Sequence, residues 1–147
     1  AIKNALKHVS TNKILVLNGD SFNEVNYLEI LNTHRQSTAD ISVLTKSVPN
    51  IARYGEVQIG PLGEIIAFIE KTGLEKPGNI NAGVYVLSGN LFDNYYPDVF
   101  SFETFLCENV DLKDIRAVAS QGSFIDIGVP EDYQKFVSLI EGQNVHK

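Results

Sequence analysis

The sequence has no methionine and no tryptophan, and Cys107 is its only cysteine. A single cysteine excludes an intrachain disulfide, which fits a reducing compartment, so we expect a cytoplasmic protein. No apolar run approaches the roughly 20 residues that cross a bilayer, and no signal peptide is visible. We therefore expect no membrane partner.

Positive charge is also scarce, because 12 Lys and Arg stand against 18 Asp and Glu and give a net charge of -6. This balance argues against nonspecific binding to nucleic acid or to anionic membranes. It still allows a phosphorylated small molecule, because one local lysine or metal ion suffices. The 147 residues, 44% of them hydrophobic and 20% charged, suit one domain with a packed core.

The first residues have a helical pattern without a helix start. Ile2, Leu6 and Val9 share one face, yet no Ser, Thr, Asp or Asn precedes them as a cap. Because an initiating methionine is missing too, we expect the chain to be the later part of a longer protein.

The remaining pattern alternates strands with helices early and adds a hairpin later. The predicted strands are residues 14–17, 40–48, 56–59, 64–71, 80–87, 115–120 and 123–126. The predicted helices are residues 23–37, 91–95, 102–108 and a final one from Pro130, with Tyr133, Phe136, Val137 and Ile140 on one face. This order favours an α/β fold with a mixed, mostly parallel sheet.

One acidic residue directly follows an apolar run. Ile14 to Leu17 is typical of a central strand buried on both faces, and Asn18, Gly19 and Asp20 close it. In open α/β sheets, ligands bind at the carboxyl ends of the strands, so Asp20 is a candidate ligand-binding carboxylate. The alternative is that Asn-Gly-Asp only forms a turn.

Asp126 repeats this arrangement in the segment FIDIGVPEDY, because it ends a strand and precedes Gly128. Two such carboxylates could hold one Mg²⁺ beside a triphosphate, since Mg²⁺ prefers a few carboxylates together with phosphate oxygens. The alternative is two unrelated loop acids, because the distance between them in sequence says nothing about their distance in space.

Three further features are candidates for sugar-phosphate binding. Glu70 and Lys71 end a predicted strand, where a lysine can serve a phosphate, or where the pair is simply solvated. Asn81 offers a donor and an acceptor to a sugar hydroxyl, and Gly83 interrupts its strand as a ligand approach or an ordinary bulge. Cys107 lies in an apolar helical pattern and is expected in the core.

The order of these motifs resembles that of the sugar-phosphate nucleotidyltransferases. The segments LVLNGDSF, RYGEV, FIEK, INAGVY and FIDIGVPEDY carry the resemblance, which is closest to the enzymes that activate D-glycero-D-manno-heptose 1-phosphate with GTP; FSFE supports that subgroup. The resemblance implies a Rossmann-like three-layer α/β/α fold, with residues 1–147 as the C-terminal portion of one nucleotidyltransferase domain. It also implies transfer of a nucleotidyl group from a nucleoside triphosphate to a sugar 1-phosphate, with release of pyrophosphate.

The resemblance also implies roles for individual residues. The catalytic residues would be Asp20, Lys71 and Asp126, of which Asp20 and Asp126 would ligate Mg²⁺. The sugar site would be formed by Tyr54, Gly55, Glu70, Asn81 and Gly83. The product would enter nucleotide-sugar biosynthesis for lipopolysaccharide or capsule.

The chain departs from the family pattern in its nucleotide half. The family's glycine-rich loop, with its Arg and Lys, and its Gly-Thr-Gly-Gly segment do not occur, and Val129 stands where Thr is usual. We therefore expect the chain alone to be inactive, and we expect uncovered sheet surface to make it self-associate as a homo-oligomer. The alternatives are a noncatalytic sugar-phosphate-binding module and a metal-dependent glycosyltransferase, whose Asp-x-Asp motif Asp20-Ser21-Phe22 does not supply.

Overall fold

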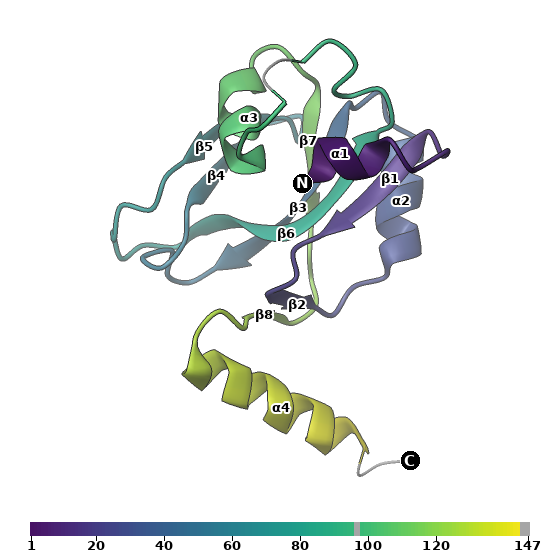
Figure 1. Cartoon of the computed structure of the whole chain (residues 1–147). Helices are drawn as coiled ribbons and strands as arrows, with labels where there is room; N and C mark the ends of the chain where they lie inside the picture. The colour runs from purple at the N-terminus through teal and green to yellow at the C-terminus, as the bar shows by residue number, and fades with distance from the viewer. Residues whose placement is uncertain (96–97, 145–147) are drawn as a thin grey trace.

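The computed structural model describes residues 1–95 and 98–144. Figure 1 shows a central sheet with helices on two sides and a last helix that projects away from it. In chain order the elements are α1 (Ile2–Leu6), β1 (Lys13–Leu17), β2 (Ser21–Asn23), α2 (Tyr27–Arg35), β3 (Ile41–Val48), β4 (Glu56–Ile59), β5 (Ile65–Ile69), β6 (Gly78–Ser88), α3 (Phe102–Asn109), β7 (Ile115–Ala119), β8 (Phe124–Asp126) and α4 (Pro130–Asn144).

The large sheet has the strand order β5-β4-β6-β3-β7, with β1 also paired to β6. The expectation of a mixed sheet is confirmed, but the expectation that it is mostly parallel is wrong for the described strands. Only β3 and β7 run parallel, whereas β6 runs against β1, β3 and β4. Hydrophobic patterning indicates which residues are buried but not the direction of a strand, so it could not decide this point.

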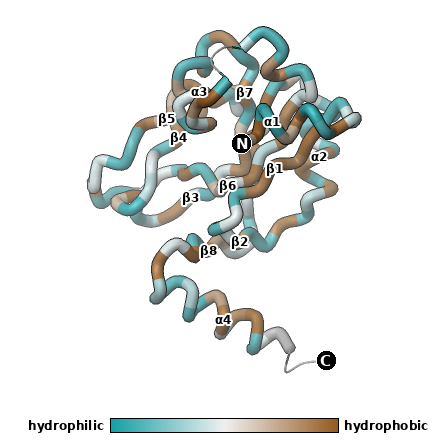
Figure 2. The backbone as a smooth tube through the Cα atoms, viewed as in Figure 1, coloured by the Kyte–Doolittle hydropathy of each residue, from teal (hydrophilic) through white to brown (hydrophobic). Residues whose placement is uncertain are grey.

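The sheet is covered on both faces, as expected for three α/β/α layers. Along β6, Ala82, Val84 and Val86 belong to the core beneath α2, whereas Tyr85 and Leu87 belong to the core beneath α1 and α3. This alternation follows from the two-residue period of a strand. The hydropathy colouring in Figure 2 places apolar segments along β1 and β6, in the middle of the molecule.

β1 differs from its prediction as a central strand buried on both faces. Its register with β6 runs from Lys13 opposite Ser88 to Leu17 opposite Val84, and no strand among the described residues pairs with its other edge. The side chain of Leu17 is accordingly 50% exposed. An apolar run reports the hydrophobicity of a strand and not how many neighbours cover it.

The chain between β1 and α2 also differs from its prediction. Asn23, expected in a helix, lies in β2, because its buried Nδ2 donates to the carbonyl oxygen of Ala82 at 2.8 Å. The helix begins at Tyr27, with Asn26 as its cap, whose Oδ1 accepts from the backbone N–H of Leu28 at 3.1 Å. Residues 91–94, predicted as helical, form turns closed by i to i+3 hydrogen bonds instead.

The hairpin and the last helix follow the sequence pattern more closely. β4 and β5 pair across the predicted tight turn, in which Gly63 has a φ of +80°. α4 begins at Pro130 as predicted, and Phe136 on its apolar face packs against Phe22, with ring centroids 5.1 Å apart. Tyr133, assigned to that face, is 54% exposed because the helix projects from the sheet (Figure 1).

No helix in the described ranges is both long and apolar enough to cross a membrane.

His34 lies fully buried between α2 and the sheet. Its Nδ1 is 2.8 Å from Oγ of Ser42, and its Nε2 has no hydrogen-bond partner among the described residues. Burial lowers the pKa of His34, nearby Lys13 lowers it further, and Asp40 opposes the shift. The folded chain therefore resists protonation here.

This shift predicts a pH dependence of stability. An unfolded histidine has a pKa of about 6.5, so below that pH the unfolded chain takes up a proton that folded His34 refuses. The free energy of unfolding should therefore fall as the pH drops from about 6.5 towards the lowered folded pKa. Urea denaturation between pH 5 and 8 should give a flatter profile for His34→Gln than for the unchanged chain. Exposed His8→Gln is the control, and parallel profiles for His34→Gln and the unchanged chain would contradict the assignment.

Gly83 provides a second stability prediction. Its φ is +74°, and a Cβ there would lie 2.9 Å from Nδ2 and 3.0 Å from Cβ of Asn18. Gly83→Ala should lower the free energy of unfolding by about 1–3 kcal/mol, the usual cost of such a backbone conformation for other residues. Gly19→Ala is the matched control, since a Cβ at Gly19 has no atom within 4 Å. Equal unfolding midpoints for the two variants would refute this expectation.

Candidate active site

A cavity of about 490 Å³ lies between α3, the β4–β5 hairpin and β6. Its wall contains predicted site residues from separate parts of the chain, namely Tyr54, Gly55, Glu70 and Asn81. The other residues of the wall are Glu56, Val57, Phe68, Ile69, Ser101, Glu103, Thr104, Leu106 and Cys107. The structure thus joins motifs whose convergence the sequence could not establish.

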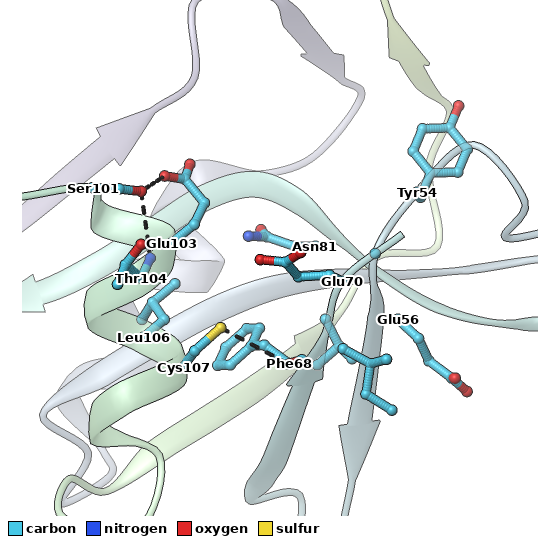
Figure 3. A pocket seen from close by; sticks show the side chains of 13 residues that line it. Tyr54, Glu56, Phe68, Glu70, Asn81, Ser101, Glu103, Thr104, Leu106 and Cys107 are labelled. Atoms are coloured by element: carbon cyan, nitrogen blue, oxygen red, sulfur yellow. Dashed lines mark hydrogen bonds between the residues drawn. The ribbon is translucent and has the colours of Figure 1, made fainter. Parts of the chain in front are cut away.

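The wall carries negative charge, because its ionisable groups among the described residues include glutamates but no Lys, Arg or His. Glu56 is paired outside it with Lys76, at 2.7 Å and 3.0 Å, and its carboxylate points away in Figure 3. Glu70 and Asn81 lie between α3 and Tyr54 in the same view. Carboxylate and amide oxygens accept hydrogen bonds from hydroxyls, so the cavity suits an uncharged polyhydroxyl ring.

Asn81 is held in place by its own strand. Its Oδ1 accepts from the backbone N–H of Gly83 at 3.0 Å, and its Nδ2 donates to the hydroxyl of Tyr85 at 2.7 Å. Gly83 does not line the cavity. It instead forms the bulge at which the register of β3 against β6 shifts, between Val43 and Thr45. The predicted bulge is therefore present.

Glu103 is a wall residue that the sequence analysis did not assign. It lies in the first turn of α3, where Ser101 caps the helix and donates from Oγ to Glu103 Oε2 at 2.7 Å. Glu103 also lines the adjoining open hollow that contains Asp20, so it borders both spaces. The FSFE segment, used above only to support the subgroup, contains Glu103 as its last residue.

The backbones of Asp20 and Asp126 lie close together at one end of the small β2–β8 sheet. Ser21 pairs with Asp126, and the backbone N–H of Ile127 donates to the carbonyl oxygen of Asp20 at 2.9 Å. Oδ1 of Asp126 accepts from the N–H of Gly128 at 3.0 Å. The donor type fits Mg²⁺. No group of three or more His, Cys, Asp or Glu that could hold a metal occurs in the described part of the chain, so other ligands would have to come from phosphate and water.

Two residues lie elsewhere than their sequence assignments suggest. Lys71 is exposed just beyond β5 and is not in the cavity wall, although Glu70 before it is. Cys107, expected in the core, is exposed and lines the cavity, with Sγ 3.8 Å from the carbonyl oxygen of Phe68. Partial burial, followed by the charge of Glu70, raises the pKa of the Cys107 thiol, which disfavours the nucleophilic thiolate. The helical pattern correctly placed Cys107 on a helix, but it could not indicate that a cavity lies beside that helix.

An ion pair fixes the Tyr54 side of the cavity to α4. Nη2 of Arg53 lies 2.7 Å from Oδ2 of Asp132, and Nζ of Lys135 lies 2.7 Å from Oδ1 of Asp132. The hydrogen bonds from Lys135 and Arg53 lower the pKa of Asp132. The Arg53 guanidinium also lies 5.8 Å from the centre of the Tyr54 ring. These contacts link the cavity rim to the helix that follows Asp126.

Known proteins resemble the chain over nearly its whole length. The D-glycero-alpha-D-manno-heptose 1-phosphate guanylyltransferase of Campylobacter jejuni is 38% identical over 138 residues, which cover 93% of this chain and 60% of the relative. The enzyme of the same name from Aneurinibacillus thermoaerophilus is 35% identical over 137 residues, covering 92% and 59%. The crystal structure of HddC from Yersinia pseudotuberculosis is 34% identical with a TM-score of 0.81, covering 91% and 58%, and HddC complexed with GMP-PN gives 0.80.

The chain thus spans about 60% of the length of these two curated relatives. Residues 1–141 match the family described as Nucleotidyl transferase. That match covers well over half of the 147 residues. The chain therefore belongs to the nucleotidyl transferase family.

Proposed function

We propose that this chain carries the sugar-binding and metal-binding part of a sugar-1-phosphate nucleotidyltransferase. The reaction transfers a nucleotidyl group from a nucleoside triphosphate to a sugar 1-phosphate and releases pyrophosphate. We propose GTP as the nucleoside triphosphate. The heptose 1-phosphate guanylyltransferases among its relatives support a heptose as the sugar. The main support from the structure is the cavity that brings Tyr54, Gly55, Glu70 and Asn81 together.

The proposed chemistry divides between two places. The sugar ring occupies the cavity, where Glu70 and Asn81 accept and donate hydrogen bonds to its hydroxyls. Its phosphate lies outside, because no Lys, Arg or His of residues 1–95 and 98–144 lines the cavity. Lys71, next to Glu70, serves the phosphate as a point charge. The attacking phosphate is already an anion, so the site needs alignment and charge neutralisation rather than a strong base.

Asp20 and Asp126 would hold a Mg²⁺ ion at the β2–β8 sheet. When bound, the ion supplies positive charge that offsets part of the charge of the triphosphate. The pairing of Ser21 with Asp126 and the hydrogen bond from Ile127 to Asp20 keep the backbones of the two acids close together. We place this activity in the cytoplasm, in the supply of lipopolysaccharide or capsule precursors.

We also propose that copies of the chain associate, which light scattering at tens of micromolar would test.

The metal site gives the first functional prediction. Mn²⁺ binding, followed by electron paramagnetic resonance with a nonhydrolysable GTP analogue present, should weaken at least tenfold in Asp20→Asn and in Asp126→Asn, because each removes a charged oxygen ligand. Exposed Asp111→Asn is the control and should bind Mn²⁺ as the unchanged chain does. Unaltered Mn²⁺ affinity in both site variants would rule out this metal site.

The second functional prediction concerns turnover. Pyrophosphate release from GTP, ATP, CTP or UTP with heptose 1-phosphate should be undetectable for this chain alone. The family's glycine-loop amides and its Arg and Lys do not occur in it, and each lost transition-state donor costs about 10²- to 10³-fold. A protein spanning the full length of the relatives should turn over. Turnover by the chain alone that is lost in Asp126→Asn would contradict this account, whereas inactivity of the longer protein with every substrate would favour a noncatalytic sugar-phosphate-binding module.

A further inference from the structure

The hydroxyl of Tyr85 lies behind the cavity wall and touches Asn81. The Tyr85 side chain is only 1% exposed, and its ring packs edge-on against Phe102, with centroids 5.0 Å apart. The Tyr85 hydroxyl is not in the wall, so a molecule in the cavity meets Asn81 and not Tyr85. The 2.7 Å hydrogen bond from Asn81 Nδ2 joins the two side chains.

The bulge at Gly83 makes this contact possible. Residues four apart in a regular strand are separated by about 13 Å, at about 3.3 Å per residue. A bulge bends its strand and strengthens the local twist. Gly83, with its φ of +74°, lies midway between Asn81 and Tyr85, and the register with β3 shifts at this point. The same glycine donates its N–H to Oδ1 of Asn81.

These two contacts determine which way the amide of Asn81 faces. A backbone N–H can only donate, so the atom facing Gly83 must be Oδ1 and the atom facing Tyr85 must be Nδ2. The Tyr85 hydroxyl must then accept. Burial raises the pKa of Tyr85 to about 12, although the hydrogen bond from Asn81 opposes the shift, so the hydroxyl stays neutral at physiological pH. One lone pair on Oδ1 and one hydrogen on Nδ2 remain for a ligand.

We propose that Tyr85 is a positioning residue, which orients the amide of Asn81 so that it accepts from one sugar hydroxyl and donates to a neighbouring one. The inference rests on the proposed function, because it takes the occupant of the cavity to be the ring of a sugar 1-phosphate. The ligand feature recognised is a pair of adjacent hydroxyls. Tyr85 acts only through Asn81 and does not touch the sugar.

The test is binding of D-glycero-D-manno-heptose 1-phosphate and mannose 1-phosphate to the 147-residue chain by isothermal titration calorimetry. Tyr85→Phe keeps the buried ring and removes only the oxygen, and it should weaken binding about tenfold, the upper range for one lost hydrogen bond. The matched control is Tyr95→Phe. Tyr95 packs in the same aromatic cluster, but its hydroxyl lies 3.4 Å from Glu108 and outside the cavity wall, so this variant should bind normally.

A double-mutant cycle separates positioning from a general structural effect. Tyr85→Phe should have no further effect on binding in the Asn81→Ala background, whereas a structural effect would add to that of Asn81→Ala. Inorganic phosphate should bind equally to the unchanged chain and to Tyr85→Phe, because the phosphate lies outside the cavity. Additive losses in the cycle, or equal sugar-phosphate affinity in the unchanged chain and Tyr85→Phe, would overturn the inference and leave the proposed function standing.

A second measurement requires no variant. In the unchanged chain, one of the two Nδ2 hydrogens of Asn81 should exchange with solvent much more slowly than the other by NMR, because it is bound to the buried hydroxyl of Tyr85. Rapid exchange of both hydrogens would overturn the inference even if sugar phosphates bind. Absence of binding of any sugar 1-phosphate by the unchanged chain would overturn the proposed function and this inference with it.

Discussion

Gly83 forms a bulge in β6, the longest of the described strands. β6 is the strand that pairs with β1, β3 and β4, so a bend in β6 affects its pairing with all three strands. Gly83 adopts a φ of +74°, and its carbonyl oxygen accepts from the backbone N–H of Asn18, just after β1, at 2.7 Å. Its N–H fixes Asn81, and Asn18 leads into the turn that carries Asp20. The backbone conformation of Gly83 therefore helps to position both Asn81 in the cavity wall and the turn that carries Asp20.

The electrostatics divide the site in the way that the proposed reaction needs. In the part of the chain that the structure describes, glutamates and no cations line the cavity, which favours hydroxyls and disfavours phosphate. The acids of the β2–β8 sheet lie beyond it, where a divalent ion would be accessible to phosphate oxygens. Glu103 borders both spaces, because α3 places it at their junction. A sugar phosphate with its ring in the cavity and its charge outside would fit this division.

The local backbone around Asp20 and Gly83 was predictable, because short motifs carry their own local geometry. An apolar run that ends in Asn-Gly-Asp places Asp20 after a strand, and Gly83 inside a strand signals a bulge. Lys71 and Cys107 show the limit of this reasoning. Lys71 follows a residue of the wall but lies outside it, and Cys107 follows an apolar pattern yet faces the cavity. Periodicity identifies a face of an element, whereas the space opposite that face depends on the neighbouring element.

Sequence alone was enough to predict the β4–β5 hairpin and the start of α4 at Pro130. These depend on residues close in the chain, where dihedral preferences and local hydrogen bonds decide. Tertiary structure alone decided that β6 runs against its neighbours and that β1 has an edge free of described strands. It also decided that Glu103 borders both the cavity and the open hollow that contains Asp20. Such features depend on packing between segments far apart in sequence, because strand direction and cavity walls arise only when those segments are in contact.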